Sequence, residues 1–266
     1  MASRAAIYGR LAGSRLRAQY QYRFSFALQI VGAFALSFLD FIEVLVIFHH
    51  LPALGGWSLG EVAFLYGSSY VVFRFADMTM GALDRLPVLI RMGTLDQVLT
   101  RPLGSLWQVL TTDIGVRHVG GMVQGGIVFW FALTRVHIHW TALRVAVFVS
   151  MLIGGAVIFC AIWVATNAIA FWTMDAREVA NSVTYGGNYL TNYPLHIFGV
   201  WLRRLLAYVI PLAFVNYFPS LYVLDKRSPI GSPVLRFVSP LVAAGAVVAA
   251  GAIWKTAVRH YRSSGS

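Results

Sequence analysis

Long apolar runs alternate with short polar segments along this chain. Six of these runs reach the roughly 20 mostly apolar residues that an α-helix needs to cross a hydrocarbon core about 30 Å thick. The runs are 24–51, 59–83, 109–133, 143–172, 197–218 and 234–255. The pattern predicts an all-α integral membrane protein with six transmembrane helices.

The composition supports this class. Hydrophobic residues make up 58% of the chain and charged residues only 12%, which lies outside the range of soluble domains of this length. We expect one six-span membrane domain over residues 24–258, followed by a cytoplasmic tail at 259–266.

The basic residues predict the orientation, because cytoplasmic loops keep the excess of Lys and Arg. Most of the 21 basic residues fall before the first span, in the loop 84–108, around Arg177, Arg203 and Arg204, or after the last span. Both termini should therefore be cytoplasmic. The net charge of +11 has the same origin and indicates attraction to the inner leaflet, with no nucleic-acid partner.

The first 23 residues carry five arginines and no acidic residue. The apolar run behind them is too long for a signal-peptide core. Several apolar and aromatic residues fall on one half of a helical wheel, so we expect an interfacial helix over residues 1–23. A disordered basic leader is the alternative.

Two connections between the apolar runs stand out. The loop 84–108 has room, between Pro87 and Pro102, for a helix of about two to three turns, which would be a docking element. Prolines crowd the stretch 211–233, and each one removes a backbone donor. Broken backbone at membrane depth needs cover from protein or water, so we expect a re-entrant segment here near the outer surface.

The chain has no motif for catalysis or nucleotide binding. It lacks GxxxxGK[ST], HExxH and GxSxG, so we expect no enzyme activity, cofactor or metal on this chain. The pairs His49–His50 and His137/His139 lie at predicted outer boundaries without nearby carboxylates. They are the only candidate site of a membrane-embedded lipid-modifying enzyme.

Four charged residues lie at membrane depth in the second and third predicted spans, where each must meet protein, water or an opposite charge. Counting inward at about 1.5 Å per residue predicts crosswise pairs, Arg74 with Asp113 and Arg117 with Asp77. Such pairs would either clamp the two helices together or line a transport path.

Two acids of the first span, Asp40 and Glu43, lie one turn apart and have no evident partner in the sequence. A proton-coupled secondary transporter would need such acids. Together with Asp77, they are the support for that alternative.

Small residues predict where helices pack closely. The third span contains Gly120, Gly121, Gly125 and Gly126, and the segment 243–252 is almost wholly Gly, Ala and Val. Close backbone approach at small residues is a main source of helix association in lipid. The contact could lie within the chain or between two copies.

Two motifs resemble a known family. The segment 90–103, IRMGTLDQVLTRPL, resembles the cytoplasmic motif between the second and third spans of ABC-2-type transporter permeases, where a Gly-Thr-Leu-Asp/Glu turn leads to a Leu-x-x-Pro-Leu element. Tyr193-Pro194, Trp201 and the segment 210–219 resemble a branch of that family long described as a domain of unknown function. The histidine pairs and the segment 225–227 belong to neither motif.

The resemblance implies the transmembrane permease subunit of an ATP-driven exporter in a bacterial plasma membrane. Two permeases, identical or not, would pair above a dimer of separate cytoplasmic ATPase subunits, which would bind ATP and Mg²⁺. The substrate would pass between the permeases, along faces of the first, second and fifth spans. The coupling helix of the 84–108 loop would contact the ATPase through Leu89, Ile90, Arg91, Leu95, Asp96, Val98, Leu99 and Arg101.

Overall fold

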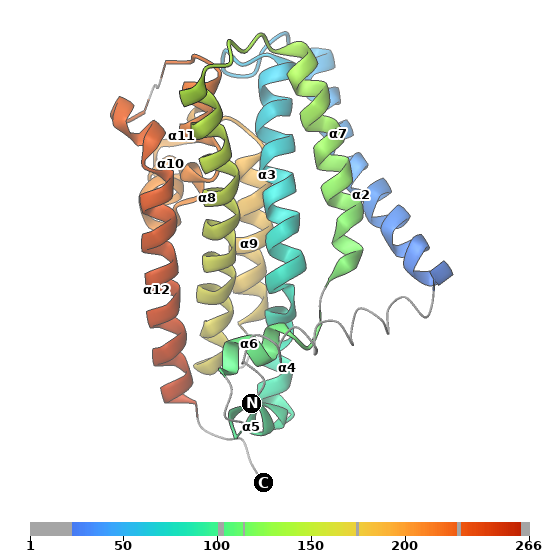
Figure 1. Cartoon of the computed structure of the whole chain (residues 1–266), viewed down its shortest axis with the longest axis vertical. Coiled ribbons are helices and arrows are strands. Elements are labelled where there is room, and N and C mark those ends of the chain that lie inside the picture. The colour runs from blue at the N-terminus through green and yellow to red at the C-terminus, as the bar shows by residue number, and fades with distance from the viewer. Residues whose placement is uncertain (1–22, 101–103, 114, 174–175, 228–229, 262–266) are drawn as a thin grey trace.

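The computed structural model describes residues 23–100, 104–113, 115–173, 176–227 and 230–261. The interfacial helix expected over residues 1–23 therefore lies, except for Arg23, outside the described residues. Within them the chain is helical, with a single isolated β-bridge between Leu54 and Trp57. The long helices run lengthwise in Figure 1: α2 (Arg23–His50), α3 (Leu59–Met80), α7 (Val119–Arg135), α8 (Ala142–Asn167), α9 (Arg177–Thr191) and α12 (Ser239–His260).

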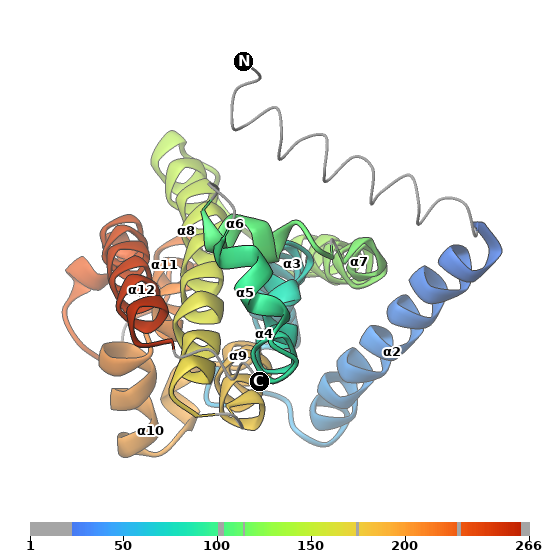
Figure 2. The ribbon, with the colours of Figure 1, turned by 90° about the horizontal axis from the view of Figure 1, so that it is seen from below.

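The two ends of the bundle differ. The upper end in Figure 1 carries the connections 51–58 and 136–141, and the lower end carries short helices, which Figure 2 shows from below. The short helices of the lower end are η1 (Gly81–Arg85), α4 (Leu86–Arg91), α5 (Thr94–Leu99), α6 (Ser105–Leu110), η2 (Val116–His118) and η3 (Ala168–Phe171). Those that follow α9 are η4 (Leu195–Ile197), α10 (Val200–Arg204), the π-helical turn η5 (Leu205–Val209), η6 (Leu212–Phe214), α11 (Tyr217–Val223) and η7 (Pro233–Phe237).

Three helical stretches are long and apolar enough to cross a membrane: Phe24–His50, Ala142–Phe171 and Ser239–His260. The pair Val200–Val209 and Leu212–Val223 would make a fourth, if its bend of 76° lies within one span. α3, which carries Glu61, Arg74 and Asp77, and α7, which has 17 residues, are not among them. The all-helical membrane class is confirmed, whereas the number of six spans stays a prediction.

The third predicted span begins ten residues later than expected. Residues 109–118 do not continue α7, because the chain forms the end of α6, a turn and η2 before α7 starts at Val119. The hydroxyls of Thr111 and Thr112 bond the carbonyls of Gln108 and Val109, which offers the backbone an alternative to helix.

The fifth lengthwise helix is α9, and the sequence interpretation placed it in a loop. The predicted fifth span 197–218 begins at the upper end, where the imidazole Nε2 of His196 lies 2.7 Å from the Gly55 carbonyl. Lys226, after α11, returns to the same place and bonds the Gly56 carbonyl at 2.8 Å. The stretch 196–226 thus begins and ends at the upper end of the bundle. Arg203 and Arg204 therefore do not lie at the lower end with the other arginines that the sequence interpretation placed in the cytoplasm. Which side of the membrane each end faces stays a prediction.

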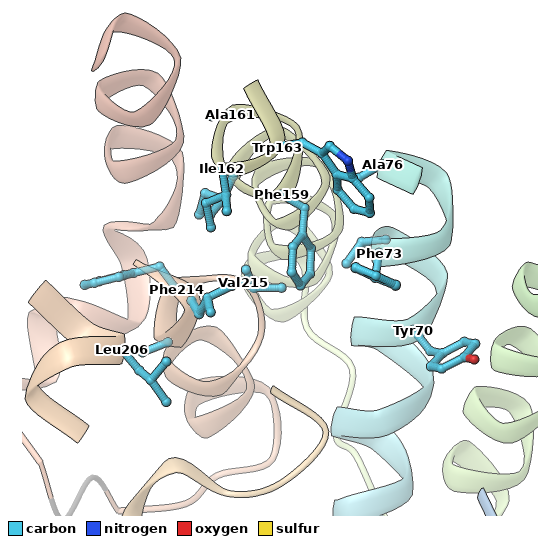
Figure 3. Close-up of a cluster of buried hydrophobic side chains, with 14 of the residues drawn as sticks. Tyr70, Phe73, Ala76, Phe159, Ala161, Ile162, Trp163, Leu206, Phe214 and Val215 are labelled. Atoms are coloured by element: carbon cyan, nitrogen blue, oxygen red, sulfur yellow. The ribbon is translucent and has the colours of Figure 1, made fainter. Parts of the chain in front are cut away.

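An apolar core joins α3, α8 and the stretch after α9 (Figure 3). The Phe73 ring on α3 lies 5.3 Å from that of Phe159 and 5.4 Å from that of Trp163, both on α8. A Cβ on Gly155 would lie 2.8 Å from the Val215 carbonyl oxygen, so glycine allows this close approach. The core fixes α3 at the centre, and the remaining face of α3 is free to carry polar groups.

α3 and α7 pack through small residues. A Cβ on Gly67 would lie 2.6 Å from the Phe129 backbone, and one on Gly120 would lie 2.2 Å from the Ile30 carbonyl of α2. Gly121 and Gly125 likewise face α3. The close packing expected of this glycine cluster therefore occurs within the chain, except at Gly126, whose Cβ would meet nothing within 4 Å.

Candidate functional site: a polar network along α3

One face of α3 carries Tyr70, Arg74 and Asp77, spaced four and three residues apart. This spacing places them on one side of a helix, one above the other. Arg74 is partly buried and the Asp77 side chain is only 2% exposed. Burying charges is costly without partners, so each group needs compensation from its neighbours.

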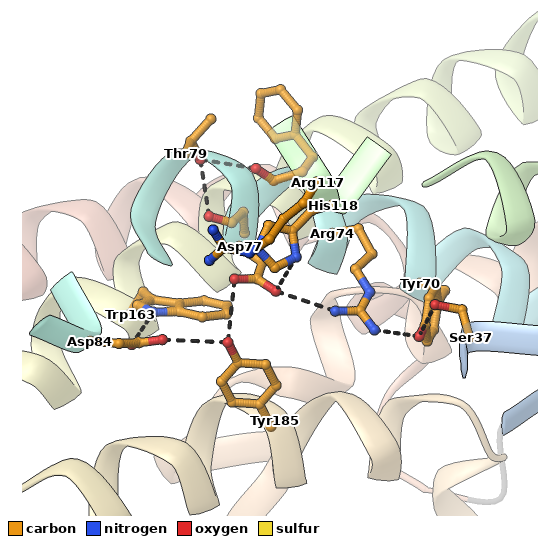
Figure 4. A network of polar contacts seen from close by, with 12 residues as sticks. Ser37, Tyr70, Arg74, Asp77, Thr79, Asp84, Arg117, His118, Trp163 and Tyr185 are labelled. Atoms are coloured by element: carbon orange, nitrogen blue, oxygen red, sulfur yellow. Dashed lines mark hydrogen bonds and ion pairs between the residues drawn. The ribbon is translucent and has the colours of Figure 1, made fainter. Parts of the chain in front are cut away.

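Asp77 is compensated from three sides (Figure 4). Its Oδ2 accepts from Arg74 Nη1 at 3.3 Å and lies 2.9 Å from His118 Nδ1. Its Oδ1 accepts from the Tyr185 hydroxyl at 3.3 Å. α3, η2 and α9 meet at this one carboxylate.

The predicted crosswise pairs are wrong. Arg74 pairs with Asp77 on its own helix, and Asp113 lies 3.2 Å from Arg85 and 3.9 Å from Arg117. The depth count assumed one continuous helix through 109–133, but Asp113 and Arg117 belong to the lower-end turn, where the Arg117 side chain is 48% exposed.

His118 takes the position that the sequence interpretation gave to Arg117. The interpretation missed it, and the sequence offers no signal for it beyond its position next to Arg117. Its neighbour Val119 begins α7, so the histidine lies where η2 turns into that helix.

Above Asp77, the network reaches α2. Arg74 Nη2 donates to the Tyr70 hydroxyl. That hydroxyl contacts Ser37 Oγ at 2.8 Å and Asp40 Oδ2 at 3.1 Å. Asp40, expected to lack a partner in the chain, is thus joined to Asp77 through Tyr70 and Arg74.

Glu43 also has a partner, contrary to expectation. The Tyr189 hydroxyl on α9 donates to its carboxylate. Tyr185 and Tyr189 lie four residues apart on α9, so the helix presents both tyrosines on one face, toward α3 and α2, and Tyr193 follows four residues later, just past its end. This spacing is the signal that could have revealed α9.

Below Asp77, the network ends at Asp84 in η1. The Tyr185 hydroxyl lies 3.4 Å from Asp84 Oδ2, and Oδ1 accepts from Trp163 Nε1 at 2.8 Å. Burial raises the pKa of Asp84 above its ordinary value, the hydrogen bond from Trp163 opposes this, and the charge of Asp77 adds to the rise. The Tyr185 hydroxyl has one proton, so it can donate to only one of the two carboxylates at a time.

The expected docking loop is two short helices. α4 and α5 have six residues each and are joined at Gly93, whose φ of +66° favours glycine. Ile90 and Leu95 are 6% and 0% exposed, so they pack inside this chain and cannot enter a partner's groove. Of the other residues expected to contact the partner, Leu89, Val98 and Leu99 are partly buried against the core, Asp96 is half-buried, and Arg101 lies outside the described residues.

The exposed tip of this α4–α5 hairpin consists of Val88, Arg91 and Met92. Val88 is 43% exposed and Met92 is 68% exposed. The hairpin lies at the lower end of the bundle in Figure 1. A partner can therefore reach the tip.

The described residues include no group of three or more His, Cys, Asp or Glu side chains placed to hold a metal ion. The chemistry of the network is therefore that of hydroxyl, guanidinium, imidazole and carboxyl groups. Such a network can hold helices together, bind a polar solute or pass protons.

The family model of the ABC-2 family transporter protein matches residues 34–265. The chain belongs to this family. Its members are membrane transport components, and membership implies association with an ABC ATPase. No curated protein and no solved structure matches this ABC-2 chain.

Proposed function

We propose that this ABC-2 protein is the transmembrane permease subunit of an ATP-driven exporter. It would span a bacterial plasma membrane several times, with both termini in the cytoplasm. A second permease, either a copy or a paralogue, and two separate ATPase subunits would complete the transporter. The match to the ABC-2 family over most of the chain carries this proposal.

The α4–α5 hairpin is the proposed contact with the ATPase. Its tip combines the exposed apolar Met92 and Val88 with the charge of Arg91, a composition that suits an apolar groove with an acidic rim. ATP and Mg²⁺ would bind to the partner. Closure of the ATPase dimer would push the hairpin and shift the permease pair between inward-open and outward-open states.

The polar network is the proposed lining of the substrate path. Asp40, Glu43 and Tyr189 are exposed at the border of α2, α3 and α9. Arg74 and Asp77 are less exposed and contact Asp40 through Tyr70. Exposed acids and hydroxyls beside a buried arginine favour a substrate with polar or cationic groups.

Co-purification with the cognate ABC ATPase tests the docking proposal. Met92→Glu should abolish co-purification, because it places a carboxylate on the exposed tip without touching the core. Thr112→Glu, at an exposed lower-end position outside the hairpin, is the matched control. Equal recovery of the ATPase with wild type and both variants would contradict docking at this tip.

A proton-coupled secondary transporter is the second candidate. The observation in its favour is the pair of acids Asp40 and Asp77, which could bind and release protons and are linked through Tyr70 and Arg74. The two candidates differ in their energy source. Transport that an uncoupler stops while cellular ATP is maintained would favour this second candidate, and transport that persists favours the exporter.

A further inference from the structure

The stretch after α9 contains a π-helical turn at its bend. The Ile210 amide donates to the Leu205 carbonyl at 2.8 Å, five residues back, immediately before Pro211. π-turns are rare and occur frequently at functional sites. This one turns Tyr208 and Val209 outward, to exposures of 64% and 71%.

A cavity of about 380 Å³ lies between this turn, α8 and α12. Its lining is almost wholly aliphatic and small on α12, where it runs from Val242 to Ile253. At 1.5 Å per residue, these eleven steps span about 16 Å along the helix. A Cβ on Gly245 would meet nothing within 4 Å, which shows that the space beside this glycine is open.

A second cavity of about 280 Å³ adjoins the first and is basic. It is lined by Arg203 and Arg204, together with Val200, Tyr208, Ile230 and Gly231. Tyr208 lines both cavities, and its hydroxyl lies 4.0 Å from the position of a Cβ on Gly231, on the basic side.

The two arginines of this cavity form no ion pair with a carboxylate in the part of the chain that the structure describes, whereas Arg144 and Lys226 nearby pair with Asp225 and Glu61. Adjacent positive charges at a cavity attract an anion, and guanidinium groups match the geometry of phosphate.

The two cavities together fit one kind of molecule. An apolar groove along α12, a helix able to cross a membrane, suits an acyl chain that lies along the bilayer normal. α10, which carries the two arginines, lies beside the upper part of α12 in Figure 1. The basic cavity there suits a phosphate headgroup, and Tyr208 lies between the headgroup and the acyl chain, as aromatic side chains do at membrane interfaces.

We propose that Arg203, Arg204 and Tyr208, with the groove between η5, α8 and α12, form a binding site for one anionic phospholipid. The phosphate lies against the two arginines and one acyl chain fills the groove. The site is separate from the polar network of α3. The proposal does not rest on ATP-driven export, since it needs only this chain in a membrane.

Native mass spectrometry of the full chain in detergent, with phosphatidylglycerol or phosphatidylcholine added, tests the site. Wild type should retain one phosphatidylglycerol at least tenfold more tightly than phosphatidylcholine. Arg203→Gln/Arg204→Gln should remove this preference, because the phosphate loses both cations. Gly245→Leu should weaken retention of the lipid at least tenfold, since the new side chain enters open space within the groove.

Two controls keep the test specific. Gly251→Leu adds the same side chain on α12 where a Cβ also meets nothing within 4 Å, outside the groove. Arg135→Gln removes an exposed upper-end arginine outside both cavities. Both should retain phosphatidylglycerol like wild type, and equal loss in a control and its matched variant would overturn the site.

Three other results would also overturn it. Glycerol phosphate that competes as well as the lipid would mean an anion site without an acyl chain. Equal retention of both phospholipids by wild type would mean that the arginines do not select the headgroup. A shift from dimer to monomer caused by Gly245→Leu alone would mean that a second copy of the chain fills the groove.

Discussion

At the scale of single residues, Asp77 decides how the polar network is held. A buried carboxylate with three partners stabilises the meeting of α3, η2 and α9, and removal of one partner leaves charge less compensated. His118 matters more than Arg117 for this reason. The former is 13% exposed beside Asp77, whereas the latter is 48% exposed at Asp113.

His118→Ala should therefore lower the free energy of unfolding by about 1–3 kcal/mol. Arg117→Ala should change it by about 0.5 kcal/mol or less, as is usual for an exposed ion pair. Asp77→Asn in the His118→Ala background should restore part of the loss, because the unpaired charge is then absent. Thermal unfolding in detergent measures all three, and additive losses in the double variant would show that the two residues do not interact.

Asp84 predicts a pH dependence. Its raised pKa means that the folded protein binds a proton more tightly than the unfolded chain. Its contribution to stability is then complete at low pH and is lost as pH rises from the ordinary value of 3.8 through the raised pKa. Asp84→Asn, which keeps the acceptor for Trp163, should flatten the unfolding temperature over that range. An unchanged pH profile in the variant would contradict protonation of Asp84.

At the scale of elements, hydropathy predicts the helices that face lipid. The runs 24–51 and 143–172 match α2 and α8 closely, and α12 begins five residues after the predicted start at 234. Hydropathy does not predict α9, because its polar residues face α2 and α3 instead of lipid. Hydropathy also predicts too early a start for α7. The hydroxyls of two threonines bond nearby carbonyls, and the chain forms a turn where the apolar run predicts helix.

The same limit explains the site. The sequence alone shows that Asp40, Glu43, Arg74 and Asp77 are costly to bury, because each is an ionisable residue within a long apolar run. Hydropathy does not predict three of their partners. Tyr189 and Tyr185 come from the helix that was missed, and His118 comes from a turn that was taken for helix.

Two glycines of α7 test whether its packing is internal. Gly120→Ala should destabilise the protein by about 1–3 kcal/mol, because the methyl group would overlap the Ile30 carbonyl of α2. Gly126→Ala should be neutral or stabilise by up to about 1 kcal/mol through helix propensity. Thermal unfolding of both variants measures the difference. A reversed order would mean that α7 packs through its other face.

At the scale of the whole molecule, the account gives the two ends different roles. The lower end, with the α4–α5 hairpin, would face the cytoplasm and the ATPase, while the stretch 196–226 would lie at the outer end. The positive charge of Arg203 and Arg204 then belongs to the outer half. It is an exception to the rule that places basic residues inside, and the basic cavity gives it a role.

Cysteine labelling measures this arrangement. In a Cys160→Ala background, cysteines at Ala53 and Arg204, both exposed, should react with an impermeant maleimide added outside intact cells. A cysteine at Met92 should react only after the membrane is opened. If Arg204→Cys is labelled from the same side of the membrane as Met92→Cys, the stretch after α9 lies at the cytoplasmic end, which would contradict the account.

The central claim is that a separate ATPase works through this chain, and ATP hydrolysis tests it most directly. The rate is measured for the cognate ATPase, alone and co-reconstituted in nanodiscs with wild type, Met92→Glu or Thr112→Glu. We predict that wild type and Thr112→Glu stimulate hydrolysis several-fold. With Met92→Glu, the rate should equal that of the ATPase without any permease. An identical rate with and without the wild-type chain would contradict the account.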